Sequence, residues 1–196
     1  MSVQTITVEF VGPFSWFGGN DISSILEAEA GKMSGVYLWT VQLDEGELVY
    51  YVGETGRSFA QRMLEHFREH MSGGYHLYEP HEFSHGRKVL LWPGRYGPDR
   101  EPSLSVFIQR FRDLVSVVVD LAELYRFYVA PLECEKRLRE RIEAGLANHL
   151  YEQPGMVGKF QDRGIIYRAR KDTEEAVQAL IQCRANLIGV PKLLWI

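Results

Sequence analysis

The chain has 196 residues, of which 45% are hydrophobic and 12% aromatic, and its 22 basic and 26 acidic side chains give a net charge of −4. This composition excludes a disordered chain, and the sequence contains no apolar run of about eighteen residues that would predict a membrane span. The length predicts one domain over residues 1–196.

The cellular location is predicted from the first residues and the cysteines. The sequence from Met1 to Thr5 has neither a basic flank nor an apolar signal core, which does not indicate secretion. Cys134 and Cys183 are most simply free thiols in a reducing compartment. We therefore expect a cytoplasmic protein.

The first fifty residues predict three strands and a short helix. Residues 4–11 alternate apolar and polar side chains as a strand does, and residues 21–30 predict a short helix. Residues 35–42 and 48–53 are rich in β-branched and aromatic side chains, and the sequence Asp-Glu-Gly at 44–46 between them favours a hairpin turn. The hairpin should therefore pair two antiparallel strands.

A helix is predicted from residue 58 to about residue 70. Ser58 is a good N-cap, and Gln61 three residues later completes a capping box. Two neighbouring stripes follow from the helical period, a core stripe and a polar one. The core stripe is Phe59, Met63 and Phe67, and the polar stripe is Arg62, His66 and His70. We expect Arg62 and His66 to project together from the edge of the buried face.

The rest of the chain predicts further elements with fewer clear boundaries. Residues 71–102 are dense in Gly, Pro, His and aromatic side chains. The predicted strands are residues 88–92, 124–129 and 165–168, and the predicted helices are residues 104–114, 131–151 and 173–188.

Two triplets on the hairpin carry the strongest functional signal. Gly35-Val36-Tyr37 is followed after thirteen residues by Tyr51-Val52-Gly53, and then by Arg62 and His66, four positions apart. These features resemble the GIY-YIG nuclease family, in which the two triplets lie on neighbouring strands and precede a helix with Arg-x-x-x-His. Glu143, followed by Leu146, stands on a later helix where the family has its metal-binding glutamate. Four elements in this order are more specific than either triplet alone.

The resemblance implies a fold and a division of the chain. We expect an α/β (α+β) domain with a small, mostly antiparallel sheet flanked by helices. Its GIY-YIG-like core would span about residues 33–70 and 124–152, with an insertion at about 71–123 and a C-terminal extension at about 153–196. The expected function is metal-dependent endonuclease activity on DNA, of a restriction-type or stand-alone enzyme.

The chemistry of phosphodiester hydrolysis divides the candidate residues among roles. Glu143 would hold one Mg²⁺, or alternatively Mn²⁺, because such ions need few protein carboxylates. The guanidinium of Arg62 suits the non-bridging phosphate oxygens. A phenol is a poor base near neutral pH, but the resemblance implies such a role for a tyrosine; Tyr37 is the first candidate for accepting the proton of the attacking water and Tyr51 for orienting water or phosphate, although these two roles are exchangeable. His66 would assist the base or bind phosphate.

Each of these residues also has a structural interpretation. Tyrosines on a hairpin commonly pack, and Arg62 with His66 alone would be an ordinary surface pair. Glu143 has rivals on its helix, but it borders an apolar stripe and should be partly buried, and a partly buried carboxylate requires a partner such as a metal ion. The rivals are Glu133, Glu135, Glu140 and Glu152, and the stripe is Leu138, Ile142, Leu146 and Leu150.

Binding of DNA, expected to be double-stranded, requires a local positive surface on this acidic chain. The candidates for substrate binding are Arg57, Arg87, Lys88 and Arg95. A zinc site at His76, His81 and His85 is disfavoured, since their spacing matches no common structural site and no cysteine lies nearby. The sequence leaves three properties open: the cleavage specificity, whether the substrate is DNA or RNA, and whether the protein forms a homo-oligomer. No membrane partner is expected.

One departure from the family favours a second hypothesis. Many family members have an asparagine about a dozen residues after the glutamate, whereas this chain has the sequence Pro-Gly-Met-Val at 154–157. The competing interpretation is a module that binds nucleic acid or protein on the same fold without cleavage, in which the tyrosines only pack. An exposed cluster of the five candidates would favour the enzyme, and their burial would favour the binding module.

Overall fold

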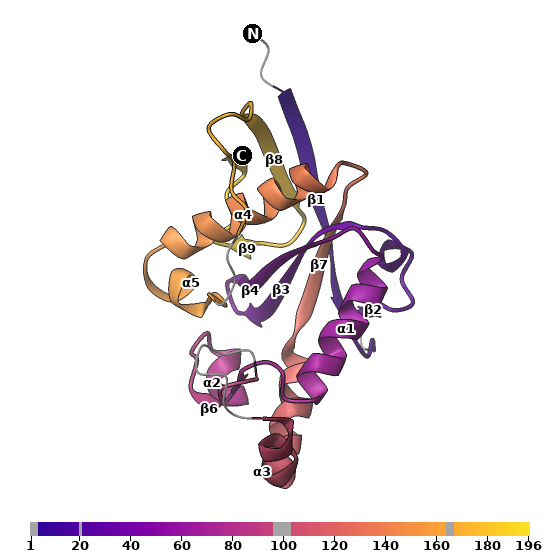
Figure 1. The fold of residues 1–196 in the computed structure, drawn as a ribbon, viewed down its shortest axis with the longest axis vertical. Helices are drawn as coiled ribbons and strands as arrows, with labels where there is room; N and C mark the ends of the chain where they lie inside the picture. The colour runs from indigo at the N-terminus through magenta and orange to yellow at the C-terminus, as the bar shows by residue number, and fades with distance from the viewer. Residues whose placement is uncertain (1–3, 20, 96–102, 164–166) are drawn as a thin grey trace.

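The computed structural model describes residues 4–19, 21–95, 103–163 and 167–196. It is a mixed α/β fold built around a curled sheet (Figure 1). Within the described residues the main sheet has eight strands, seven of them in the order β10-β8-β1-β7-β3-β4-β9, and β2 pairs with β1. These strands are β1 (Gln4–Ser15), β2 (Ser23–Ser24), β3 (Gly35–Leu43), β4 (Gly46–Thr55), β7 (Arg126–Pro131), β8 (Val177–Cys183), β9 (Leu187–Ile188) and β10 (Leu193–Trp195).

The remaining elements lie around this sheet. The helices are η1 (Glu29–Lys32, a 3₁₀ helix), α1 (Phe59–Met71), α2 (Pro80–Ser84), α3 (Leu104–Leu124), α4 (Lys136–Glu152) and α5 (Gly155–Phe160), and a small ribbon pairs β5 (Leu77–Tyr78) with β6 (Leu90–Trp92). None of the helices in the described part of the chain combines the length and apolarity needed to cross a membrane.

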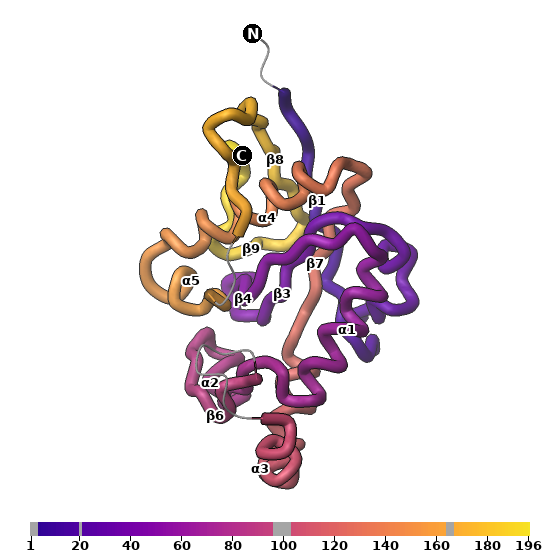
Figure 2. Tube along the Cα trace, viewed as in Figure 1, coloured from indigo at the N-terminus to yellow at the C-terminus, as the bar shows by residue number. Residues whose placement is uncertain are grey.

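The central pairings of the sheet are antiparallel, whereas the pairings of β1 with β8, of β1 with β2 and of β4 with β9 are parallel. β3 pairs antiparallel with both β4 and β7, and β7 pairs antiparallel with β1. β1 and β8 come from opposite ends of the chain and run parallel along seven residue pairs, so segments far apart in the sequence lie side by side (Figure 2). The expectation of a mostly antiparallel sheet therefore holds for the centre, but the C-terminal segment enlarges the sheet.

Both faces of the sheet are covered, because alternate side chains of a strand point to opposite faces. On β3, Tyr37 and Trp39 join a core with α1 and α3, whereas Val36 and Leu38 join a second core with α4. Figure 1 shows α1 and α4 flanking the β3–β4 pair. A site at the edge of β4 can therefore receive side chains from both layers.

Several predicted elements agree with the structure, with shifted ends. The hairpin forms over residues 35–55, and Ser58 caps α1 by accepting a 3.2 Å hydrogen bond from the Gln61 amide. Such a cap contributes about 1 kcal/mol. The predicted helix 104–114 continues to residue 124, the strand 124–129 is Arg126–Pro131, the helix 131–151 begins at Lys136, and the strand 88–92 is Leu90–Trp92. Cys134 and Cys183 are free thiols.

The predicted helix at residues 21–30 is wrong. Residues 23–24 form β2, and only the short helix η1 follows. The Ser24 hydroxyl donates to the carbonyl of Trp16 at 2.8 Å and accepts from the amide of Leu26 at 3.2 Å. A serine that satisfies backbone groups in this way favours a turn over a helix.

The predicted helix at residues 173–188 is also wrong, since this segment forms β8 and β9. Along β8, Val177, Ala179 and Ile181 are buried and the intervening Leu180 and Gln182 are exposed, which is a strand period. The predicted strand at 165–168 lies partly outside the described residues, and its described part, Tyr167 and Arg168, is not in a strand.

Candidate functional site at the edge of strand β4

The register of the hairpin determines where the tyrosine of the first triplet lies. Tyr37 on β3 is the cross-strand neighbour of Gly53 on β4. A Cβ atom at Gly53 would lie 2.3 Å from Cζ and 2.4 Å from the hydroxyl oxygen of Tyr37. Glycine at this position therefore leaves the space that the Tyr37 ring occupies.

A β-bulge on β4 turns two consecutive tyrosines to the same face. Trp39 is opposite Tyr51, but Thr40 is opposite Val49, so Tyr50 is an extra residue on β4. Both Tyr50 and Tyr51 consequently pack with the core on the α1 side. Bulges commonly redirect side chains in this way next to functional sites.

Helix α1 brings Arg62 and His66 to Tyr37. The Nε–H of Arg62 donates to the Tyr37 hydroxyl at 3.2 Å, and that hydroxyl lies 2.8 Å from Nε2 of His66. The other ring nitrogen of His66, Nδ1, lies 2.7 Å from the hydroxyl of Tyr75. We call the connected side chains of Arg62, Tyr37, His66 and Tyr75 the polar chain. Arg62 and His66, predicted to project together from α1, both contact the Tyr37 hydroxyl, and Tyr75 is an additional member.

Burial controls the ionisation of the polar chain. Tyr37 is fully buried, which raises its pKa, and the charge of Arg62 offsets part of this effect. Burial lowers the pKa of His66 well below its usual value, and the positive charges of Arg62 and Arg57 lower it further. His66 is therefore neutral at pH 7, with one donor and one acceptor nitrogen for its two tyrosine partners.

Tyr51 is the more accessible tyrosine of the two triplets. It is half-buried and lines a pocket, whereas Tyr37 does not. Burial still raises the pKa of Tyr51 well above its usual value, and its neighbours Tyr37, Tyr167 and Glu143 raise it further. Of the two phenols, Tyr51 is the better placed to contact an incoming water. The role of proton acceptor, first given to Tyr37, therefore fits Tyr51 better.

Glu143 approaches β4 from the opposite layer, on α4. Its Oε1 accepts a 3.0 Å hydrogen bond from the backbone amide of Glu54, a donor on the open edge of β4. Among the described residues none donates to its second oxygen, Oε2. Burial raises the pKa of Glu143 to about 7, and the nearby carboxylate of Glu54 contributes to the rise. The predicted partial burial of Glu143 is confirmed.

Two backbone carbonyls and a carboxylate along this edge of β4 also have polar partners. The carbonyl of Val52 accepts from the hydroxyl of Tyr167 at 3.3 Å, and the carbonyl of Tyr50 accepts from the amide of Asp162 at 2.8 Å. The side chain of Glu54 pairs with Arg139 at 3.1 Å. The edge of β4 is thus covered by polar groups from α4 and from the segment after α5, which also blocks pairing with another strand.

The residues around Glu143 fit a single hard cation. Within the described ranges no three His, Cys, Asp or Glu side chains gather into a metal-binding group. A Mg²⁺ ion, however, usually takes only one or two carboxylates and completes its shell with water and phosphate oxygens. A partly buried carboxylate with a raised pKa and an oxygen not bonded by the described residues has the chemistry of such a ligand.

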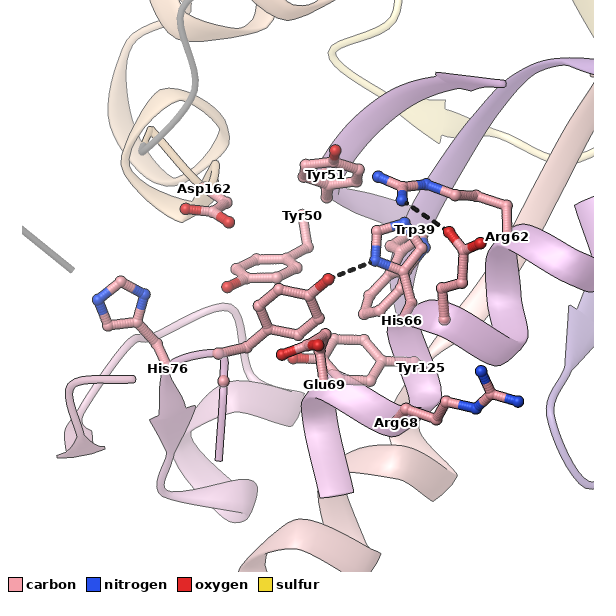
Figure 3. A pocket seen from close by; sticks show the side chains of 13 residues that line it. Trp39, Tyr50, Tyr51, Arg62, His66, Arg68, Glu69, His76, Tyr125 and Asp162 are labelled. Carbon is pink, nitrogen blue, oxygen red and sulfur yellow. Dashed lines mark hydrogen bonds and ion pairs between the residues drawn. The ribbon is translucent and has the colours of Figure 1, made fainter. Parts of the chain in front are cut away.

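Beside the polar chain lies a pocket of about 560 Å³ (Figure 3). It is lined by Trp39, Tyr50, Tyr51, Arg62, Glu65, His66, Arg68, Glu69, Gly74, Tyr75, His76, Tyr125 and Asp162. Sequence reasoning missed the participation of Tyr50, Tyr125 and Asp162. The consecutive tyrosines at 50 and 51 were the available signal for Tyr50, but only the bulge turns both toward the pocket.

The four predicted substrate-binding cations do not gather at this site. Arg57 is exposed and pairs with Glu65, and Arg87 is exposed and pairs with Glu82. The ammonium of Lys88 donates to the carbonyl of Gln161 at 2.7 Å. Arg95 pairs with Glu69 at 3.1 Å, and both Glu69 and Glu65, the partner of Arg57, line the pocket, although none of the four cations does.

The three histidines of the insertion make local contacts. His76 lines the pocket and stacks on Tyr78 with ring centroids 6.0 Å apart. His85 contacts the backbone carbonyl of His81 through Nδ1 at 2.7 Å.

Comparisons with known proteins identified no relative: no protein-family model, curated protein or solved structure matches the chain.

Proposed function

We propose that this protein is a metal-dependent endonuclease that hydrolyses phosphodiester bonds in DNA, with a site like that of the GIY-YIG nucleases. One observation supports this most: Arg62, Tyr37 and His66 are hydrogen-bonded to one another, and Glu143 lies close enough to influence the pKa of both Tyr37 and Tyr51. Residues separated by more than a hundred positions thus surround one edge of β4.

Arg62 is the group that binds the scissile phosphate. Its side chain is 30% exposed, so its guanidinium is reachable, and its Nη1 pairs with Glu65 at 3.1 Å. The hydrogen bond from its Nε to Tyr37 fixes the guanidinium plane. A fixed guanidinium favours bidentate contact with phosphate oxygens, and a partly exposed ion pair such as that with Glu65 is weak enough to exchange for phosphate.

Tyr37 and His66 act as positioning residues. Both are buried, and the hydroxyl of Tyr37 accepts from Arg62 while it is itself held by His66. Neutral His66 adds no charge that would repel Arg62. Their contribution is therefore to keep Arg62 in one orientation when a phosphate arrives.

Tyr51 accepts the proton of the attacking water. Its phenolate oxygen takes the proton as the water oxygen forms its bond to phosphorus, while the bond from phosphorus to the leaving oxygen of the strand breaks and that oxygen takes a proton from solvent water. The raised pKa of Tyr51 makes the phenolate scarce near neutral pH, so the reaction should accelerate as the pH rises. Arg62 lowers the pKa of Tyr51 through its positive charge, although burial has the larger effect.

Glu143 would hold Mg²⁺ or Mn²⁺ through its carboxylate. The bound cation would neutralise charge on the phosphate and lower the pKa of nearby hydroxyl groups. Glu143 must be deprotonated to bind the ion, and its pKa of about 7 makes that binding dependent on pH in the neutral range.

A second candidate function is a non-catalytic module that binds nucleic acid or protein. It is favoured by the complete burial of Tyr37, which does not line the pocket and so cannot contact a ligand there, and by the Pro-Gly-Met-Val sequence at 154–157. The two functions differ in one outcome, which is cleavage.

The test is incubation of purified protein with supercoiled plasmid and Mg²⁺, with EDTA as a control, followed by separation of nicked and linear DNA on a gel. Cleavage that EDTA abolishes supports the nuclease. Binding of the plasmid in a gel-shift experiment, with no cleavage in Mg²⁺ or Mn²⁺, supports the non-catalytic module.

A further inference from the structure

The pocket beside the polar chain is larger than phosphodiester hydrolysis requires. The proposed chemistry uses Arg62 and Tyr51, which lie at one side of it, whereas its volume of about 560 Å³ extends to Asp162 and His76 (Figure 3). Pockets that enclose a small organic ligand typically measure about 300–1,000 Å³. The remaining space is therefore large enough for a part of the substrate beyond the phosphate.

The walls of the pocket are aromatic. Tyr75 and Tyr51 both face Trp39, with ring centroids 6.4 and 6.1 Å from it. Trp39 itself packs against Tyr125, with ring centroids 4.8 Å apart. Rings held in fixed positions form a surface on which a planar ligand stacks, as nucleobases do in proteins that bind single strands.

The walls are also fixed by hydrogen bonds outside the pocket. The backbone amide of Asp162 donates a hydrogen bond to the carbonyl of Tyr50 on β4, and the carbonyl of Asp162 accepts one from the Tyr151 hydroxyl at 2.7 Å. The carbonyl of the preceding Gln161 accepts from Lys88 at 2.7 Å. A pocket built on such fixed elements loses little conformational entropy when it binds a ligand.

Charge differs between the two sides of the pocket. Arg62 lies on one side, where Glu65 also lines the pocket and pairs with it, and the carboxylates of Asp162 and of Glu69, which pairs with Arg95, lie away from Arg62 (Figure 3). Carboxylates repel phosphate but accept hydrogen bonds from the exocyclic amino groups of bases. A ligand with an anionic end and a planar amino-bearing end fits this arrangement, and a nucleotide has both.

We infer that the pocket receives one unpaired, amino-bearing nucleobase of the strand whose phosphate Arg62 binds. The inference rests on the proposed function, in that a phosphate at Arg62 anchors the nucleotide. A base inside a duplex cannot reach such a pocket. The preferred substrate under this inference is single-stranded DNA or DNA with an unpaired nucleotide at the cleavage point, in contrast to the double-stranded DNA expected from the sequence.

The test measures binding without cleavage. Fluorescein-labelled strands of eight nucleotides, (dA)₈, (dC)₈ and (dT)₈, and an abasic strand of equal length are titrated with protein in EDTA, and anisotropy is recorded. We expect (dA)₈ to bind at least tenfold more tightly than the abasic strand and (dC)₈ more tightly than (dT)₈. Equal binding of (dA)₈ and the abasic strand would overturn the base pocket, and equal binding of (dC)₈ and (dT)₈ would overturn the preference for amino groups.

A matched pair of variants separates stacking from hydrogen bonding. Tyr75→Phe and Tyr75→Leu both remove the hydroxyl that contacts His66, but only Tyr75→Leu removes the ring. We expect Tyr75→Leu to bind (dA)₈ roughly 5- to 100-fold more weakly than Tyr75→Phe, with no difference on the abasic strand. Equal affinities of two folded variants for (dA)₈ would contradict the proposal.

Asp162→Asn supplies an independent arm if Tyr75→Leu does not fold. It should remove the preference for (dC)₈ over (dT)₈, whereas Asp120→Asn on the exposed part of α3 should keep it. A preference retained in Asp162→Asn would count against the role of this carboxylate. EDTA prevents cleavage, so the binding experiment is independent of the nuclease activity. Base-dependent binding without plasmid nicking would support the base pocket and contradict the nuclease. Nicking without base-dependent binding would support the nuclease and contradict the base pocket.

Discussion

Gly53 faces the ring of Tyr37 across the β3–β4 pair so closely that a Cβ atom would lie 2.3 Å from Cζ of the tyrosine. The two triplets of the hairpin are thus one steric unit, in which the glycine of the second makes room for the tyrosine of the first. Tyr37 in turn holds Arg62 and contacts His66.

Gly53→Ala is expected to displace the Tyr37 ring and to reduce the free energy of unfolding by about 1–3 kcal/mol. Chemical denaturation measures the change. In a Tyr37→Leu background the ring is absent, so the same alanine should cost less, with a coupling energy on the order of 1 kcal/mol in the double-mutant cycle. Additive effects of the two substitutions would show that the contact is unimportant.

Arg62→Lys tests the need for a planar guanidinium. Lysine keeps the charge but lacks the Nε–H that donates to Tyr37 and the fork that contacts two phosphate oxygens. We expect the rate of plasmid nicking to fall by about 10- to 100-fold with an unfolding free energy within about 1 kcal/mol of the wild type. Arg112→Lys, on the exposed part of α3, is the control and should keep full activity.

Glu143→Gln tests the buried charge and the cation together. The folded pKa of Glu143 is raised to about 7 from an ordinary value of 4.5, so the folded state binds the proton more tightly and this group makes the protein less stable as the pH rises from about 4.5 to 7. We therefore expect Glu143→Gln to be more stable than the wild type at pH 8, by about 1–3 kcal/mol, and not at pH 4.

Addition of Mg²⁺ should raise the melting temperature of the wild type at pH 8, and less at pH 6, where Glu143 is largely protonated. Glu143→Gln should show neither shift. An equal Mg²⁺ response in the variant would place the ion elsewhere.

Tyr51 should make cleavage strongly dependent on pH. A base whose pKa lies well above the assay range gives a rate that rises about tenfold per pH unit, and we expect this slope between pH 7 and 9. Tyr51→Phe should lose most activity and the slope with it. Tyr37→Phe should weaken phosphate binding through Arg62 but retain the slope. A slope that persists in Tyr51→Phe would assign the base to another group.

Much of the site follows from local sequence rules. The hairpin, the cap at Ser58 and the four-residue spacing of Arg62 and His66 are properties of neighbouring residues, and the structure confirms them. The partial burial of Glu143 followed from the apolar stripe that it borders.

Long-range features were not predictable in this way. Residues 177–183 form a strand because they pair with β1, more than 160 positions away. The exposed Leu180 interrupts the alternation of apolar and polar side chains that would predict this strand. The bulge that turns Tyr50 into the pocket and the covering of the β4 edge by Asp162 and Tyr167 depend on tertiary packing. Local periodicity carries no information about these contacts.

The most direct test of the account compares first-order nicking rates of one supercoiled plasmid by wild-type protein, Glu143→Gln and Glu152→Gln in Mg²⁺. Glu152 lies on the same helix and is exposed, so it controls for the loss of one carboxylate. We predict that Glu152→Gln nicks at the wild-type rate and that Glu143→Gln is slower by more than about 100-fold. Equal rates for the wild type and Glu143→Gln would contradict the account.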